Sequence, residues 1–302
     1  MRFNLSIYFL VLFFISVLVA CNTPEDPLQI VFLGHPYDWQ SEGQRIDPRL
    51  EKMPFDTFDQ IWLGGDVCGR LTQKDETLLY LDSLFSFKNG NVHWAWGNHD
   101  LVYGRQDYLE KITGKPGFYF TRKGSLGIMV LNTNLFYFPG GNIPPERCIA
   151  KDQQLEMIQS VTDTVTGLSH LVVLHHHCLL SDTLSGFTIH PDSIFNEAHP
   201  EYWVSCKEKG TFTHIFYPHF KKMQESGVEV VFIGGDVGMH AKEFAYKNPD
   251  GIWFLGSGIN NTVDKRYLPK YVWTTAPDKI LLLTYHPDSK VLDWTFHPLG
   301  GD

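Results

Sequence analysis

Five short apolar runs, each ending in Gly, Asp, Asn or His, constrain the fold of this chain more than any other feature. They are "LQIVFLG" at 28–34, "FDQIWLGGD" at 58–66, "NVHWAWGNHD" at 91–100, "SHLVVLHHHC" at 169–178 and "VEVVFIGGD" at 228–236. Runs of this length and composition are typical of buried β-strands. Each predicted strand leads directly into side chains that can bind or catalyse, so we expect these strand ends to meet at one site.

Segments with helical spacing and polar faces separate the runs, at 74–87, 104–112, 151–165 and 214–226. Strands that alternate with helices predict an α/β layered sandwich that binds its ligand beyond the strand ends. Further apolar segments at 127–134 and 251–258, and a hairpin at 279–299 turned by Pro287-Asp288-Ser289, complete the pattern. Because no linker interrupts it, we interpret residues 28–302 as one domain.

The segment 181–213 has the weakest pattern of the chain and directly follows the run of histidines. A loop of this length within a compact domain is usually functional or disordered. We therefore predict a cap over the substrate here, inserted into the domain.

The N-terminus has the composition of a secretory signal. Arg2 precedes an apolar stretch, Ile7 to Ala20, that is too short to span a bilayer comfortably. "LVAC" at 18–21 resembles a bacterial lipobox, which implies cleavage of residues 1–20, acylation of Cys21 and a tether at 21–27; an uncleaved N-terminal anchor is the alternative. Either reading places the domain in the cell envelope, attached to a membrane and facing the periplasm or the exterior.

Charge and cysteine content narrow the function classes further. The net charge is −9, from 25 basic and 34 acidic residues, and no Lys/Arg cluster is present, which argues against nucleic acid as a partner. Beyond Cys21, an even set of cysteines remains in a compartment where disulfides can form: Cys68, Cys148, Cys178 and Cys206. Their pairing stays open, four free buried thiols are the alternative, and we expect Cys68 and Cys178 to lie near each other because both adjoin strand-end motifs.

The residue types at the strand ends indicate transition-metal chemistry. Asp, Asn and His together suit Mn, Zn or Fe better than Ca or Mg. Two such ions about 3.5–4 Å apart would clamp the attacking and leaving oxygens of a phosphoryl transfer.

The order of the motifs makes this specific. "GGDVCG" at 64–69, "GNHD" at 97–100, "VVLHHHC" at 172–178 and a Gly-rich motif at 234–238 resemble the calcineurin-like metallophosphoesterase superfamily, over most of the chain from Leu28 onward. The family pattern is Asp-x-His, Gly-Asp, Gly-Asn-His-Asp/Glu, a His after a Val-rich strand, and Gly-His-x-His. The resemblance implies a four-layer α/β/β/α sandwich of two mixed sheets flanked by helices. It also implies a hydrolase in which a metal-bound hydroxide attacks a phosphate mono- or diester, on a small molecule or a lipid- or glycan-linked substrate.

The resemblance assigns roles to individual residues. Asp66 matches the carboxylate that bridges both metals, and Asn98 matches an amide ligand of the second metal. His99 matches the imidazole beside the leaving oxygen, and Asp100 would orient it. In the histidine run, alignment of "HHC" on the family's His-His-Pro selects His176 as the metal ligand, whereas strand length selects His175; we favour His176.

The first and last motifs depart from the pattern. His35 stands at the expected Asp, Tyr37 at the expected His, and Asp236 and Gly238 at the two histidines of the last motif. The second metal keeps a full set of ligands: Asp66, Asn98, His176 and Asp236. The first metal keeps only Asp66, His35 and the phenol of Tyr37, with Asp38 and His240 as further candidates.

Three functions remain open at this point. The first is a metal-dependent phosphoesterase with an altered site, and the second is a single-metal hydrolase of another ester. The third is a lipoprotein that binds an anionic ligand without turnover. The complete "GNHD" motif favours catalysis, whereas the altered first-metal ligands count against it.

Overall fold

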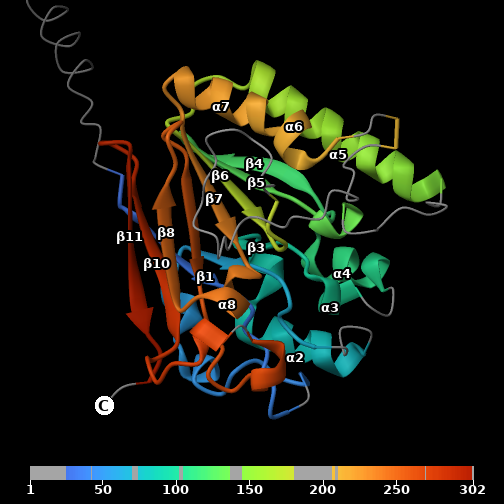
Figure 1. The fold of residues 1–302 in the computed structure, drawn as a ribbon, viewed down its shortest axis with the longest axis vertical. Helices are drawn as coiled ribbons and strands as arrows, with labels where there is room; N and C mark the ends of the chain where they lie inside the picture. Colours follow the sequence, from blue (N-terminus) through green and yellow to red (C-terminus); the bar gives the residue numbers. More distant parts are fainter. Residues whose placement is uncertain are drawn as a thin grey trace, which may run out of the picture.

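Two β-sheets pack face to face at the centre of this computed structural model (Figure 1). The structure describes residues 25–41, 43–69, 74–101, 105–136, 145–179, 206–207, 210–268 and 270–300. The predictions for residues 1–20, for Cys21 and for most of the 181–213 segment lie outside these ranges. Within them, no helix combines the length and apolar character needed to cross a membrane.

The first sheet has the strand order β11-β10-β1-β2-β3. Its strands are β1 (Leu28–Leu33), β2 (Gln60–Leu63), β3 (Val92–Trp94), β10 (Lys279–His286) and β11 (Val291–Pro298). The strands β1, β2 and β3 are parallel, whereas β10 pairs antiparallel with both β1 and β11. The sheet is therefore mixed, and the ends of its parallel strands lie along one edge.

The second sheet has the strand order β4-β5-β6-β7-β9-β8. Its strands are β4 (Tyr119–Lys123), β5 (Leu126–Val130), β6 (His170–His175), β7 (Glu229–Gly234), β8 (Glu243–Lys247) and β9 (Trp253–Ser257). The inner four are parallel and the two edge strands, β4 and β8, are antiparallel.

Helices cover the outer face of each sheet (Figure 1). On the first sheet they are α2 (Asp75–Phe85), α3 (Asn98–Leu101) and α4 (Gln106–Thr113). On the second sheet they are α5 (Pro145–Thr164), α6 (Phe212–Ile215) and α7 (Tyr217–Glu225), while α8 (Val237–His240) follows β7 at the strand ends.

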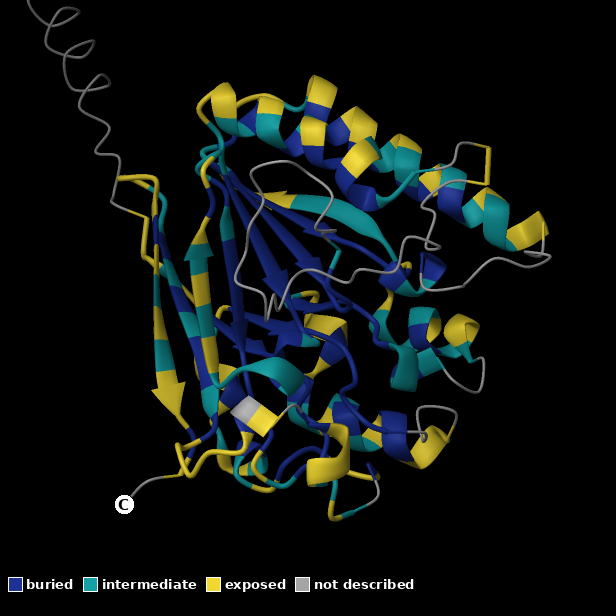
Figure 2. Cartoon of the chain, viewed as in Figure 1, coloured by how far each residue is buried: buried dark blue, intermediate teal, exposed yellow. Residues whose placement is uncertain are grey.

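Side-chain alternation along the strands builds three apolar layers. Ile30 and Phe32 of β1 point into the core between the sheets, whereas Val31 and Leu33 point into the core beneath the helices. Because successive strand residues face opposite sides, a strand covered on both faces must be apolar throughout. The inner strands are accordingly buried along their length (Figure 2). This arrangement confirms the predicted four-layer α/β/β/α sandwich.

The sequence missed the two edge strands of the second sheet. β4 ("YFTRK") and β8 ("EFAYK") carry charged residues and are half-exposed, as edge strands commonly are, so neither shows a long apolar run. The predicted helix at 214–226 is instead two helices, α6 and α7, and Pro218 lies in the first turn of the second. The closing hairpin turns at the predicted position.

Two of the four cysteines form a disulfide. Cys148, in the first turn of α5, is bonded to Cys206, while Cys68 and Cys178 are buried and are not part of this disulfide. The alternative of four free thiols is therefore wrong. The expected proximity of Cys68 and Cys178 stays a prediction.

Candidate metal centre and active site

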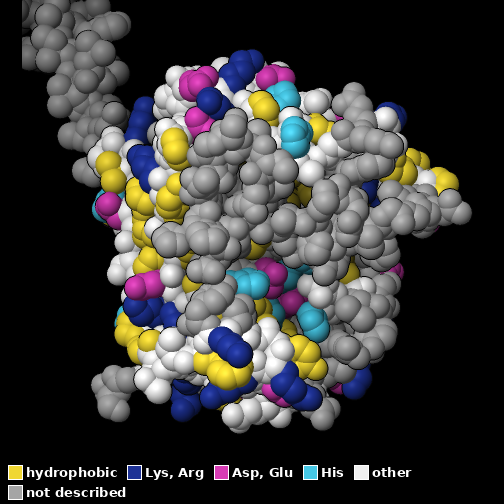
Figure 3. Space-filling view, in the orientation of Figure 1, with side chains coloured by type: hydrophobic (Ala, Val, Ile, Leu, Met, Phe, Trp, Pro, Cys, Tyr) yellow, Lys and Arg dark blue, Asp and Glu magenta, His cyan; other side chains and the backbone are white. Residues whose placement is uncertain are grey.

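Glycines bring the ends of the two sheets into backbone contact. A Cβ on Gly64, after β2, would lie 2.6 Å from the Cα of Gly235, after β7. A Cβ on Gly235 would lie only 1.7 Å from the carbonyl oxygen of Gly64. No larger residue fits at either position without backbone movement, so these glycines allow the loops after β2 and β7 to meet. Figure 3 shows the result, with His and acidic side chains next to each other near the middle of one face.

Two residues in the loops at the strand ends have positive backbone φ angles. His35 follows β1 with φ of 54° and Asp66 follows β2 with φ of 50°, and only four non-glycine residues of the described chain have positive φ. This left-handed conformation is unfavourable for residues with a Cβ, and such strain concentrates at functional sites. His35 and Asp66 are both residues that the sequence singled out as metal ligands, whereas the other two, Ser86 and Lys290, lie away from the predicted motifs.

The carboxylate of Asp66 is the centre of the site. Its Oδ2 lies 3.3 Å from Nε2 of His35, 3.5 Å from Nε2 of His176 and 3.9 Å from Nε2 of His99. Its Oδ1 accepts a hydrogen bond from the backbone N–H of His99 at 2.9 Å. His35, Asp66 and His176 are buried, whereas the His99 side chain is 29% exposed. Three imidazoles therefore face one carboxylate oxygen, and one of them is open to solvent.

Electrostatics couple Asp66 to His176. Burial alone would raise the pKa of Asp66, but the charges and hydrogen bonds of His176 and His35 hold it well below its ordinary value. Burial opposes the charged form of His176, yet Asp66 raises its pKa to about 10. Asp66 and His176 therefore favour each other's charged forms, and a metal that bound Nε2 of His176 would compete with a proton at this atom.

The structure separates the members of the histidine run. Nδ1 of His176 donates to the carbonyl oxygen of Gly64 at 2.8 Å, so neutral His176 has its lone pair on Nε2, toward Asp66. His175 instead packs against Phe232, and its Nδ1 lies 2.8 Å from the carbonyl oxygen of His177. Nδ1 of His177 lies 2.8 Å from the hydroxyl of Thr133. Thus His176, rather than His175, lies beside Asp66; its role as a ligand stays a prediction.

Burial lowers the pKa of the two flanking histidines, whereas the pKa of His176 is raised. It lowers the pKa of His175 to about 4 and that of His177 to about 3. Both are therefore neutral at physiological pH and serve the packing around His176.

Asp100 holds the Asp66 loop in place. Its carboxylate accepts hydrogen bonds from the backbone N–H groups of Asp66, Val67 and Gly97, and from the indole N–H of Trp94, at 2.8 to 3.0 Å. Burial, together with the nearby charge of Asp66, raises the pKa of Asp100 to about 7. The structure therefore gives Asp100 a role in positioning Asp66, which the sequence did not indicate; the predicted orientation of His99 by Asp100 stays a prediction.

Two of the residues that depart from the family pattern, His35 and Gly238, lie next to each other. A Cβ on Gly238 would lie 3.0 Å from the Cβ of His35 and 2.9 Å from the carbonyl oxygen of Gly34. A histidine at 238 would therefore collide with His35. The sequence, read motif by motif, could not indicate that positions 35 and 238 meet in the fold.

The other predicted ligands lie around this centre. Asp236 donates its backbone N–H to the carbonyl oxygen of His176 at 3.0 Å, and its charge contributes to the raised pKa of His176. Asn98 begins α3 and is half-buried, directly after Gly97. Tyr37 is buried, with its ring centroid 4.7 Å from that of His35. The carboxylate of Asp38 accepts from the N–H groups of Gln40 and Ser41 and so shapes its own turn.

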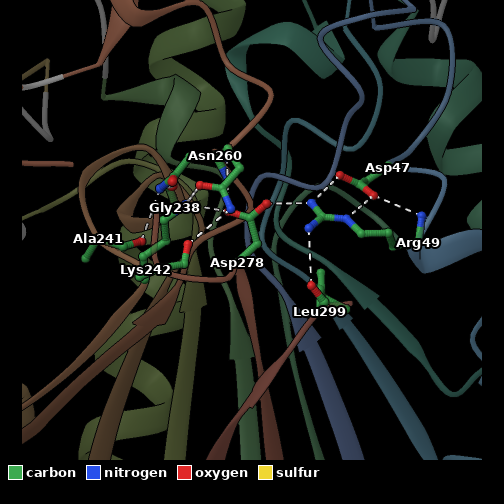
Figure 4. A network of polar contacts seen from close by, with 10 residues as sticks. Asp47, Arg49, Gly238, Ala241, Lys242, Asn260, Asp278 and Leu299 are labelled. Carbon is green, nitrogen blue, oxygen red and sulfur yellow. Dashed lines mark hydrogen bonds and ion pairs between the residues drawn. The ribbon is translucent and has the colours of Figure 1, made fainter. Parts of the chain in front are cut away.

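A buried polar network supports the short helix α8, which contains Gly238 (Figure 4). Asp278 is fully buried and accepts from Arg49 and Lys242, each at 2.5 Å, and from the backbone N–H of Asn260 at 2.9 Å. The Asn260 amide in turn donates to the carbonyl oxygen of Gly238 at 2.7 Å. No motif in the sequence marks this network, because its members are far apart in the chain.

A cavity of about 1080 Å³ opens beside the centre. His99 and Tyr37 line it on the side of the centre, and Trp39, Tyr267 and Arg266 line it further out. Apart from His99 and Tyr37, these residues were not singled out in the sequence, since no motif marks them.

The donors at the centre fit a transition metal by their chemistry. Imidazole with carboxylate suits Zn, Mn and Fe. Neutral His176 has the tautomer that a ligand requires, and its buried Nε2 faces Oδ2 of Asp66 at 3.5 Å. Within the described ranges, however, no group of three or more His, Cys, Asp or Glu side chains forms a complete metal site.

Comparison with known proteins identifies the class. A sequence model of the calcineurin-like phosphoesterase family matches residues 38–195, and the chain belongs to this family. No curated protein sequence matches the chain. Among solved structures, a dimetal phosphatase from Danio rerio is similar over 91% of this chain and 100% of that chain, with 10% sequence identity and a TM-score of 0.47. That likeness is too weak to support a conclusion about function.

Proposed function

We propose that this protein is a metal-dependent hydrolase that cleaves a phosphate mono- or diester. The observation that carries the proposal is the convergence of His35, His176 and His99 on Oδ2 of Asp66, at distances of 3.3, 3.5 and 3.9 Å. Strained backbone at both His35 and Asp66 supports it, because strain of this kind persists where surrounding structure enforces it for function. Membership of the phosphoesterase family supplies the reaction class.

The metal would be held by residues from both sheets. Asp66 and His176 are the principal ligands in this proposal, His35 takes the place of the missing histidine at 238, and Asn98 and Asp236 complete the set. Bound Mn, Zn or Fe would polarise the phosphoryl oxygens and lower the pKa of the attacking water. Elemental analysis of the purified chain would distinguish one bound ion from two.

The protein side chains have distinct tasks in the reaction. His99 is the partly exposed imidazole of the centre and also lines the cavity, so it is placed to donate a proton or a hydrogen bond to the leaving oxygen. Its backbone N–H is fixed by Oδ1 of Asp66, and Asp66 is in turn fixed by Asp100. These contacts fix the position of the proton donor, His99, relative to the carboxylate of Asp66.

Hydrolysis of p-nitrophenyl phosphate and bis-p-nitrophenyl phosphate tests the proposal. The chain is purified without chelator and assayed with added Mn, Zn or Fe, and the two substrates distinguish monoesterase from diesterase activity. Asp66→Asn is the informative variant because Asn tolerates a positive φ, so the change removes the charge while preserving the backbone. Asp288→Asn, in the exposed turn of the closing hairpin, is the matched control.

We expect activity that depends on metal, is lost in Asp66→Asn and is unchanged in the control. Loss of His99 should lower kcat by about 10²- to 10⁴-fold, which is the usual contribution of a general acid. A wild-type chain that binds metal but hydrolyses neither ester would contradict the proposal.

One observation favours a second candidate, a protein that binds an anionic phosphorylated ligand without turnover. The described residues do not form a complete metal site, and the first motif lacks its usual carboxylate. Tight binding of inorganic phosphate by a metal-free, inactive chain would support this alternative.

We further propose that the chain is lipid-anchored in the cell envelope through Cys21. The proposal is supported by the "LVAC" motif after an apolar stretch. A Cys21→Ser variant should move from the membrane to the soluble fraction or keep its signal segment. If wild type and variant fractionate alike with identical masses, the proposal is wrong.

A further inference from the structure

We propose that the cavity beside His99 binds the leaving group of the substrate and selects one that carries a planar, uncharged aromatic ring. This inference rests on the proposed phosphoesterase function for its orientation, because His99 is the predicted donor to the leaving oxygen. The ring-binding property of the cavity is an independent matter and can be measured separately.

A row of aromatic rings leads from the centre to the mouth of the cavity. Ring centroids lie 4.7 Å apart from His35 to Tyr37, 5.0 Å from Tyr37 to Trp39 and 5.3 Å from Trp39 to Tyr267. Spacings of 4.5–7 Å are those of interacting aromatic pairs. The inner members are buried or half-buried, whereas Tyr267 is 61% exposed. The row therefore forms an aromatic wall that begins at the proposed metal centre and ends in solvent.

Tyr267 presents its aromatic ring at the exposed rim of the cavity. A large aromatic side chain at the rim of a cavity leaves apolar surface in water unless something covers it. Tyrosine and tryptophan are suited to this position because they present a rigid apolar face with little conformational entropy to lose. A flat ring placed on the wall would cover this surface and stack on the rings at the same time.

Charge pairing at the rim favours an uncharged ring. Arg266 lies against the ring of Tyr267, with 5.8 Å from its guanidinium carbon to the ring centroid, and it is paired with Asp264 at 2.5 Å. Apart from His99, these two side chains are the charged groups among the described residues that line the cavity. Because they neutralise each other, the wall offers stacking and hydrogen bonding by Gln40 and Gln44 rather than a net charge.

The position of His99 orients the ligand. His99 belongs both to the centre around Asp66 and to the wall, with its ring centroid 5.5 Å from that of Tyr37. A phosphoester with its phosphate at Asp66 and its leaving oxygen at His99 would therefore extend its leaving group along the aromatic wall.

Matched substrates test the inference without a difference in leaving-group reactivity. One pair is 2-phenylethyl phosphate and 2-cyclohexylethyl phosphate, and the other is adenosine 5′-monophosphate and ribose 5-phosphate. Within each pair the phosphate is attached to a primary alcohol of similar reactivity as a leaving group. The ratio of kcat/KM therefore reports the effect of the aromatic ring rather than of leaving-group reactivity. The first pair detects a simple aryl group and the second a nucleobase.

Tyr267→Leu is the informative variant, since an exposed side chain can be replaced without loss of the fold. Trp273→Leu is the control, because Trp273 is also an exposed aromatic residue, 45% accessible, but does not line the cavity. We expect the member with the aromatic ring, 2-phenylethyl phosphate or adenosine 5′-monophosphate, to be preferred in at least one pair. Tyr267→Leu should reduce that preference on the order of tenfold, as loss of one stacking contact would, while Tyr267→Phe and Trp273→Leu should preserve it.

A binding measurement separates failure of this inference from failure of the proposed function. Saturation-transfer NMR with the uncharged alcohols 2-phenylethanol and adenosine reports ring binding in the full chain without turnover. Binding that is weakened in Tyr267→Leu but not in Trp273→Leu supports the inference even if no ester is hydrolysed. Hydrolysis with equal kcat/KM within both pairs, or ring binding unaffected by Tyr267→Leu, overturns it.

Discussion

The Asp278 network offers the sharpest test of how the site is supported, through the variant Asp278→Asn. The amide oxygen can still accept from Lys242 and from the backbone N–H groups of Asn260 and Asn261, which all bind Oδ1. The amide nitrogen then faces Arg49, which donates to Oδ2 at 2.5 Å in the wild type. The substitution replaces the acceptor Oδ2 by an NH2 group that faces the donating guanidinium of Arg49, and it removes the buried negative charge of Asp278.

The magnitude follows from what each cation retains. Arg49 is 31% exposed and keeps its paired contacts with Asp47, so its share is modest. Lys242 is only 10% exposed, and burial already lowers its pKa while Asp278 opposes that shift. Breaking one partner from a buried pair costs about 3–5 kcal/mol, and partial exposure of Arg49 reduces this, so we expect about 3 kcal/mol of destabilisation.

Urea unfolding with chelator present measures this difference without a contribution from bound metal. Asp75→Asn is the control, since Asp75 pairs with Arg105 on the surface at side-chain exposures of 59% and 41%; its expected cost is below about 1 kcal/mol. Because Asn260 connects the network to Gly238, Asp278→Asn should also weaken metal binding. A destabilisation equal to that of the control would refute the reasoning.

Three further predictions concern the centre and the core. Gly238→Ala should lower metal content, since its Cβ would lie 3.0 Å from that of His35, and elemental analysis checks this. Burial lowers the pKa of His93 from 6.5 to about 3, so His93 should make the protein less stable as the pH falls through this range, by about 1.4 kcal/mol per pH unit. An unfolding series with His93→Gln tests this: the slope should become smaller by this amount, while the contributions of His175 and His177 remain. Metal bound at a free concentration of 100 Kd should stabilise the folded protein by about 2.7 kcal/mol. Removing the metal with a chelator should therefore lower Tm, and an unchanged Tm would count against a bound ion.

The strands that form the centre of the fold could be predicted because they are buried on both faces. Such strands are continuous apolar runs, and the side chains at their ends mark the site. The edge strands β4 and β8 could not, because solvent on one side permits charges such as Arg122 and Glu243 that interrupt the pattern.

The site was predictable only in part, for a related reason. Motif order identified Asp66 and His99, but strand periodicity could not choose between His175 and His176, since a shift of one residue exchanges the two faces. The contact of His35 with Gly238 and the aromatic wall ending at Tyr267 depend on residues from different strands and loops. Only the packed structure brings those residues together.

Metal stoichiometry tests the central claim most directly. Elemental analysis of the chain, purified without chelator, is compared for wild type, Asp66→Asn and His35→Asn, because Asn tolerates the positive φ at both positions. We predict one or two transition-metal ions per chain, all weakened by Asp66→Asn. If two ions bind, His35→Asn should remove one of them. A wild-type chain that holds no metal after incubation with Mn, Zn and Fe would contradict the account.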